Sequence, residues 1–301
     1  MIRIGTRKSE LALWQANYVK DELEKKGQSC ILVTIESNDD KNILKPLYEM
    51  GIQGIFTKAL DDALLNNDID IAVHSLKDVP TLLPKGIKIS AYLKRGAAND
   101  VMVYQKKFIN WEKNNLIGTG SLRRKAQWLR KYPFHITENL RGNLKKRFEK
   151  LDKSNWGGAI FAQAGLERIN LLKNKFEVLD WMIPAPGQGT MCVLNLKKNK
   201  VLGEIVGSLN CIDTQVCSEI ERTFLNKLEG GCTAPIGAHA FIKEEKINFD
   251  GGLFSLDGSQ AIFHKTKVSL NKAKGLGSKA ATQILRKGGS ELMLEIKKLM
   301  K

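Results

Sequence analysis

Two adjacent arginines stand at a predicted helix start in the segment GTGSLRRKAQ, where an anion could be bound. A short strand ends there in a glycine turn, Ser121 can cap the following helix, and Arg123 and Arg124 fall in its first turn. Backbone N–H groups at a helix start and guanidinium groups both bind carboxylates or phosphates. Cations in the first turn of a helix are unfavourable because they oppose the helix dipole, so their presence needs another reason, and we favour a bound anion. The alternative is a capped helix with exposed arginines.

Further arginines follow other predicted strand ends. The segment LRGNLKKR holds Arg141 and Arg147, and AGLER holds Arg168. The chain has eleven arginines against thirty-seven lysines, so arginine is concentrated in these turns although lysine is far more abundant. Each arginine alone would be ordinary surface decoration. Together with the first pair they favour a ligand with several carboxylates, since bidentate pairing prefers arginine.

A carboxylate and a thiol are the other candidate reactive groups. In AVHSLKDVP, Asp78 follows a buried strand and Lys77, and a carboxylate there can move a proton or stabilise a cation. The alternative is an ordinary turn aspartate paired with its lysine, and we interpret His74 as a core or supporting group. In LEGGCTAPIG, Cys232 lies in a tight turn, where a thiolate is an accessible nucleophile. A structural cysteine is the commoner case without an adjacent base.

These residues lie at strand ends in an alternating β and α pattern. Strands at 2–4, 30–36 and 70–75 alternate with helices at 11–23 and 56–67, and the pattern restarts near Val101. Such alternation predicts an α/β fold with mostly parallel sheets, whose ligands bind beyond the carboxyl ends of the strands. After Asp213 a helix, several β-like runs and further helices predict a third, α+β part.

The composition is that of a soluble globular protein, with 43% apolar and 27% charged residues. The chain shows neither a run of about 20 apolar residues nor a signal-peptide core at its start, so we expect a cytoplasmic protein without membrane contact. Its five cysteines are scattered without a CxxC pair, which predicts reduced thiols and no metal site. Nucleic-acid binding is suggested only by the net charge of +16. No DNA- or RNA-binding motif is visible, so we expect no nucleic-acid partner.

Taken together, these segments resemble the porphobilinogen deaminase family over nearly the whole chain. The resemblance rests on TRKSELALWQA, GIFTKAL, DIAVHSLKDVP, GTGSLRRKAQ, LRGNL, AGLERI, PGQG and LEGGCTAPIGAHA. It implies two doubly wound domains like those of periplasmic binding proteins, at 1–95 with 189–207 and at 99–185. A smaller α+β domain would follow at 212–301. It also implies hinges near 94–99 and 183–188, and a monomer.

The resemblance also implies an activity and a set of site residues. The activity is the condensation of four porphobilinogen molecules, with loss of ammonia, to the linear tetrapyrrole hydroxymethylbilane of heme biosynthesis. Cys232 would anchor a dipyrromethane cofactor through a thioether, and Asp78 would be the catalytic carboxylate. The cofactor would be bound by Lys77, Asp78, Ser121, Arg123, Arg124, Arg141 and Arg147. The substrate would be bound by Arg7, Ser9, Phe56, Arg168 and Gln188.

The sequence departs from the family pattern at several positions. The loop before Phe56 reads EMGIQGIF, with Gln53 and Glu49 where lysines are usual, and this removes positive charge from the expected lid. Gly120 stands for a usual serine and Glu10 for a usual proline. A non-catalytic binding protein for an anionic metabolite is the competing hypothesis, and the presence of Asp78 with Cys232 argues against it.

Overall fold

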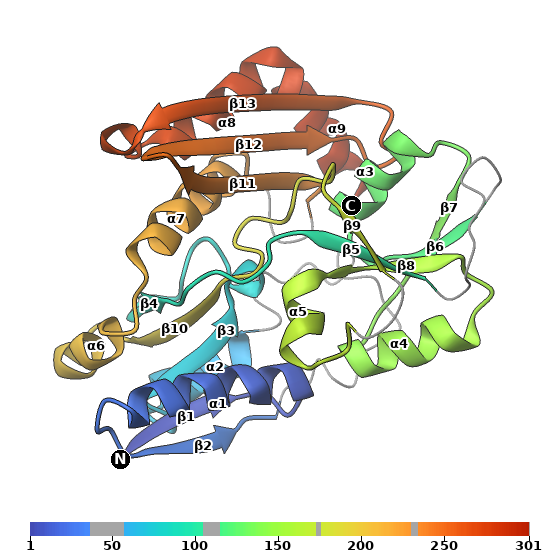
Figure 1. Ribbon diagram of the computed structural model, residues 1–301. Helices are drawn as coiled ribbons and strands as arrows, with labels where there is room; N and C mark the ends of the chain where they lie inside the picture. Colours follow the sequence, from blue (N-terminus) through green and yellow to red (C-terminus); the bar gives the residue numbers. More distant parts are fainter. Residues whose placement is uncertain (37–56, 105–114, 173–175, 230–233, 301) are drawn as a thin grey trace.

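Three sheets organise the chain in the computed structural model, which describes residues 1–36, 57–104, 115–172, 176–229 and 234–300. Two five-stranded mixed sheets lie in the lower left and right of Figure 1, and a three-stranded antiparallel sheet lies above them. The expected α/β class, with two doubly wound parts and a smaller α+β part, is confirmed. The domain limits expected from the sequence stay predictions.

The first sheet has the strand order β2-β1-β3-β10-β4. Its strands β1, β2 and β3 are parallel, and β10 runs antiparallel to β3 and β4. Helices α1 and α6 bury their apolar sides against one face and α2 against the other, so both faces are covered. The bounds are β1 Ile2–Thr6, α1 Glu10–Glu24, β2 Cys30–Thr34, α2 Lys58–Leu65, β3 Ile71–Ser75, β4 Ile87–Tyr92, β10 Met191–Leu196 and α6 Lys200–Gly207.

The second sheet repeats this plan with the order β7-β6-β8-β5-β9. Strands β7, β6 and β8 are parallel, whereas β5 is antiparallel to its two neighbours. Helix α3 packs on one face through the fully buried Trp128, and α4 and α5 pack on the other. The bounds are β5 Asp100–Tyr104, β6 Leu116–Gly118, α3 Leu122–Lys131, β7 Ile136–Glu138, α4 Leu144–Lys153, β8 Gly158–Ala162, α5 Gln163–Arg168 and β9 Phe176–Leu179.

The third sheet packs against α7, α8 and α9 around a core that includes Phe224 and Phe249. Helix α7 runs from the first sheet up to this core, so it touches both parts (Figure 1). Among the described residues, none of the helices is both long and apolar enough to cross a membrane. The bounds are α7 Ile212–Lys227, β11 Ile236–Lys243, β12 Lys246–Phe254, β13 Ala261–Ser269, α8 Leu276–Ile284 and α9 Ser290–Leu299.

The chain crosses between the first two sheets twice, at residues 93–99 (the first crossing) and at residues 180–190 (the second crossing). The two crossings lie side by side. Gly96 N donates to Gly189 O at 3.1 Å, and Leu93 N donates to Met191 O at 3.0 Å. Gly189 has φ +85°, and a Cβ there would lie 2.8 Å from the carbonyl oxygens of Gly96 and Ala97. The close approach of the two crossings therefore requires glycine at this position.

Gly189→Ala is expected to destabilise the protein more than Gly27→Ala. Gly27 also has positive φ, but a Cβ there would meet no atom within 4 Å, so its substitution measures the backbone cost alone, about 1–2 kcal/mol. At Gly189 the displacement of the neighbouring crossing adds to that cost, for a total on the order of 3 kcal/mol. Urea midpoints of the two variants test this, and equal midpoints would contradict the tight crossing.

Candidate active site

Strand β3 ends in a single 3-10 turn, Leu76–Asp78, which lies at the junction between the first two sheets (Figure 1). Leu76 N donates to Thr190 O at 2.9 Å and so joins this turn to the second crossing. Arg222 of α7 donates to the carbonyl oxygens of Val79 (2.8 Å) and Pro80 (2.6 Å). The turn that carries Asp78 is therefore held on both sides.

Helix α3 begins where the sequence predicts, because the Ser121 hydroxyl accepts from Arg124 N at 3.5 Å as an N-cap. The helix places Arg123 and Arg124 in the interior, where only 4% and 6% of their surfaces are exposed. Their guanidinium groups therefore need partners inside the protein, since an unpaired buried charge costs several kcal/mol, roughly 3–5 when a pair is broken.

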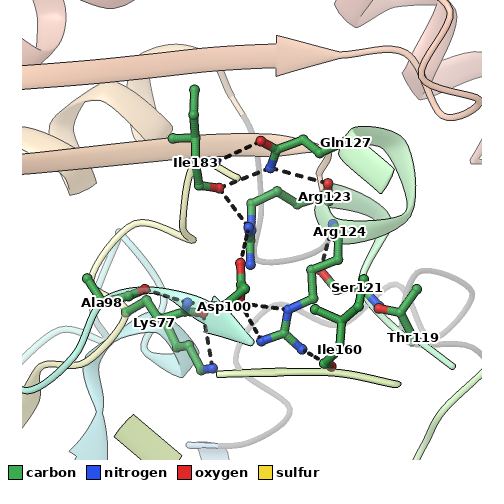
Figure 2. Close-up of polar contacts among 11 residues, drawn as sticks. Lys77, Ala98, Asp100, Thr119, Ser121, Arg123, Arg124, Gln127, Ile160 and Ile183 are labelled. Carbon is green, nitrogen blue, oxygen red and sulfur yellow. Dashed lines mark hydrogen bonds and ion pairs between the residues drawn. The ribbon is translucent and has the colours of Figure 1, made fainter. Parts of the chain in front are cut away.

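The partner of both arginines is Asp100, the first residue of β5, which is fully buried (Figure 2). Arg123 Nη1 donates to Asp100 Oδ2 at 2.7 Å, and Arg124 Nε donates to Asp100 Oδ1 at 2.9 Å. Each arginine also donates to a backbone carbonyl, Arg123 to Ile183 O (2.7 Å) and Arg124 to Ile160 O (2.9 Å). One carboxylate thus aligns two guanidinium groups.

Asp100 stays ionised in this setting. Burial would raise the pKa of its carboxyl, but the charges of Arg123 and Arg124 outweigh burial and lower the pKa to about 2. Sequence reasoning missed this residue. The only signal for it was an acidic residue placed directly before the buried run VMVY, where a charge needs a partner.

Gln188 connects Asp100 to Lys77. Its Nε2 donates to Asp100 Oδ1 (3.0 Å) and to Ala98 O (2.7 Å), and its Oε1 accepts from Lys77 Nζ at 3.5 Å. Burial lowers the pKa of Lys77 to about 8, against the raising effect of Asp78 and Asp100, while Arg124 and Arg123 lower it further. Lys77 therefore loses its charge near pH 8, well below the usual range for a lysine.

Arg147 and Arg141 approach the same region from the start of α4. Burial lowers the pKa of Arg147 to about 10; Arg124 and Arg141 lower it too, and Asp78 raises it. These effects place Arg147 within electrostatic range of Asp78 and of α3. Arg147 Nε donates to Gly142 O at 2.7 Å, whereas Arg141 Nη1 is buried without a hydrogen-bond partner in the described part of the chain.

Arg123 Nε is likewise buried and unpartnered among the described residues. Unsatisfied buried donors are rare in proteins, and on charged groups they indicate a place where an acceptor can bind. Two such donors, on Arg123 and Arg141, belong to the cluster of cations around Asp78 and Asp100. The arrangement can therefore bind carboxylates of a ligand next to a second carboxylate, Asp78, that can handle a proton.

Three other predicted residues, Ser9, Arg7 and Arg168, make contacts of their own. Ser9 accepts from Ala12 N at 3.4 Å and caps α1. Arg7 lies within electrostatic range of His74, whose pKa is lowered to about 4 by burial first and by Arg7 second. Arg168 Nη2 donates to Gly189 O at 2.6 Å, and its guanidinium lies over the Trp14 ring at 5.8 Å. In this structure Arg168 thus contacts the crossing and α1 rather than the Asp100 group.

Two predicted residues, Phe56 and Cys232, and the lid positions Glu49 and Gln53 lie outside the described residues. Before Cys232 in the chain, Asn226 of α7 contacts the segment that follows Asp78: its Oδ1 accepts from Thr81 Oγ1 at 3.2 Å. After Cys232, Ala238 N donates to Pro184 O at 3.0 Å, beside the Ile183 carbonyl that binds Arg123. In the described residues, no group of three or more His, Cys, Asp or Glu could hold a metal ion.

A second buried ion pair, also missed from sequence, fixes the third sheet to the crossings. The fully buried Glu221 of α7 accepts from Arg95 Nη1 (2.7 Å) and Nη2 (2.8 Å). Its carboxylate also accepts from Gly187 N and from Ala240 N of β11, each at 2.7 Å. One carboxylate therefore joins both crossings, α7 and the third sheet.

Two family profiles match most of this chain. The profile described as "Porphobilinogen deaminase, dipyromethane cofactor binding domain" matches residues 2–204, and "Porphobilinogen deaminase, C-terminal domain" matches 215–286. A porphobilinogen deaminase of Carboxydothermus hydrogenoformans is 38% identical over 98% of this chain and 97% of its own. One of Campylobacter concisus is 37% identical over 97% of each.

Two of the solved structures that match part of this chain are of periplasmic proteins. The periplasmic VFT2 domain of BvgS from Bordetella pertussis is 10% identical, with a TM-score of 0.43 over 69% of this chain and 86% of that one. An arginine-specific periplasmic binding protein of Salmonella typhimurium is 14% identical, with a TM-score of 0.41 over 69% and 90%. The profile matches and the identity to full-length relatives show that this chain belongs to the porphobilinogen deaminase family.

Proposed function

We propose that this chain condenses four porphobilinogen molecules into the linear tetrapyrrole hydroxymethylbilane, with loss of ammonia at each step. The main support is a cluster of buried cations beside Asp78, in which Arg123 and Arg141 each have a donor without a partner among the described residues. The chain also belongs to the porphobilinogen deaminase family. A protein that only binds an anionic metabolite would need the cations alone. It would not need a carboxylate beside them.

The chemistry of the substrate fits this cluster. Porphobilinogen carries two carboxylates, and every condensation adds two more to the growing chain. The site must therefore hold a polyanion, and arginine does so with paired, directional hydrogen bonds. Arg123 and Arg124 are already charged and aligned before any ligand arrives, so little reorganisation opposes binding.

A dipyrromethane would supply the nucleophilic pyrrole carbon from which chain growth starts. Its attachment to Cys232 would form an S–C bond as the thiol loses its proton and porphobilinogen loses ammonia. We propose that its carboxylates are bound by Lys77, Ser121, Arg123, Arg124, Arg141 and Arg147. The two unpartnered donors are what supports the fit, because bound carboxylate oxygens would satisfy them.

We propose that Asp78 acts at the reacting ring. When porphobilinogen loses ammonia it becomes a cation, and a nearby carboxylate stabilises that charge. The new C–C bond then forms at a pyrrole carbon that must lose its proton, which the Asp78 carboxylate can accept. Its placement supports this role, since Asp78 lies within electrostatic range of Lys77, Arg124 and Arg147, which would bind the carboxylates of the same rings.

The incoming substrate would be bound by Arg7, Ser9, Phe56, Arg168 and Gln188. Gln188 has the clearest support, because it already connects Lys77 with Asp100 across the two crossings. Arg168 would reach substrate only by giving up its contact with Gly189 O, so its role depends on movement between the two sheets.

Intact-mass spectrometry under denaturing conditions tests the proposed function. After incubation with porphobilinogen, the wild-type chain is expected to carry an adduct of two porphobilinogen units less two ammonias, and to form tetrapyrrole. Cys232→Ser should carry none, because it removes the proposed nucleophile. Asp78→Asn should form both the two-ring adduct and the tetrapyrrole at least about a hundredfold more slowly, because each condensation loses its proton acceptor.

Cys211→Ser is the matched control for the thiol, since Cys211 is a partly exposed free cysteine at the start of α7. Its adduct should equal that of the wild type. An adduct that persists in Cys232→Ser would remove that residue as the anchor. No adduct and no tetrapyrrole from the wild-type chain would overturn the proposed function itself.

Cofactor binding is expected to weaken as the pH rises through about 8, where Lys77 loses its proton. The sign follows from the lowered pKa: the ammonium is present below pH 8 and absent above it, well before an exposed lysine titrates. The fraction of chains that carry the adduct should fall through this range at constant ionic strength. Lys77→Arg should hold this fraction constant to higher pH, and an identical fall in both proteins would assign the effect to another group.

A further inference from the structure

We propose that Asp100 is a positioning residue for carboxylate recognition: it is the resident counterion that keeps Arg123 and Arg124 buried and aligned before a ligand binds. The inference deepens the proposed function and rests on it. It assigns to Asp100 no contact with substrate. Its contribution is made through the two arginines, whose remaining donors would bind the carboxylates of the cofactor.

Asp100 fixes the orientation of both guanidinium groups. Neighbouring residues on a helix point in different directions, yet the guanidinium groups of Arg123 and Arg124 meet at one carboxylate (Figure 2). Arg124 Nη2 also lies 2.9 Å from Asp100 Oδ1, so this arginine is bound through two nitrogens. Ile183 O and Ile160 O fix the outer edges of the two groups. Neither guanidinium can rotate without breaking a charged hydrogen bond.

In the part of the chain that the structure describes, one N–H donor of Arg123 remains free for a ligand. With Nη1 of Arg123 engaged by Asp100 and by Ile183 O, its Nε remains buried without an acceptor among the described residues. Asp100 therefore does not use up the donors of the pair. It neutralises one of two buried positive charges, and the remaining positive charge and the free N–H favour an incoming anion.

Asp100 is also connected to Lys77 through Gln188. Gln188 donates to Asp100 and accepts from Lys77, and the negative charge of Asp100 helps to keep the Lys77 ammonium protonated. The charged groups that face Lys77 are Asp78, Asp100, Arg123 and Arg124. Removing the charge of Asp100 leaves two cations and one carboxylate around Lys77, so its pKa must fall further. A residue with a packing role alone would not have this effect.

Asp100→Asn tests the proposal, because asparagine keeps the shape and removes the charge. The fraction of chains that carry the dipyrromethane adduct after incubation with porphobilinogen is expected to fall by about tenfold or more. As the pH is raised, the loaded fraction should begin to fall at a lower pH than in the wild type. Asp70→Asn is the matched control: Asp70 also binds an arginine through two nitrogens, at 2.9 and 3.1 Å from Arg3, at the opposite end of β3.

Normal loading and an unchanged pH profile in folded Asp100→Asn would overturn the proposal. If the wild type also fails to acquire the dipyrromethane adduct, the proposed function is overturned. This result is distinguishable from normal loading in both proteins, which overturns only the role of Asp100. If Asp100→Asn does not fold, the double variant Asp100→Asn with Arg123→Gln decides. A counterion role predicts that removing one arginine restores the fold without restoring loading. A double variant that stays unfolded would assign Asp100 a packing role and overturn the proposal.

Discussion

Two guanidinium groups can be buried side by side only if a negative charge lies between them. In this chain that charge is Asp100, and much of the architecture follows from bringing it to Arg123 and Arg124. Strand β5 must start at the first crossing, α3 must start at the edge of the second sheet, and the second crossing must supply Ile183 O and the Gln188 side chain. The anion site is thus assembled from segments that are far apart in sequence.

The third sheet takes part in this assembly through α7. Arg222 holds the turn after Asp78, and Glu221, one residue earlier, holds Arg95 and the second crossing. Successive residues of one helix therefore fix both the candidate catalytic carboxylate and the segments about which the sheets would move. Along the chain, α7 is also the last helix before Cys232, the proposed anchor. Movement of the sheets would have to take place around this junction.

The sequence predicted the class of fold and the local structure around several candidate site residues, because strand ends and glycine turns have local signals. Ser121 as a cap, the turn after β3 and the arginines at helix starts could all be identified from neighbouring residues. Asp100 and Glu221 could not, since each is defined by partners at least 19 residues away. The sequence also gave no indication that Arg168 would contact Gly189 O, which depends on how the crossing meets α5.

A crystal structure of the chain loaded with its dipyrromethane tests the central claim most directly. The account predicts that Asp100 still lies between Arg123 and Arg124, and that a cofactor carboxylate accepts from Arg123 Nε or Arg141 Nη1. Cofactor carboxylates that displace Asp100 from the two arginines, or that bind without contacting the cluster, would contradict it.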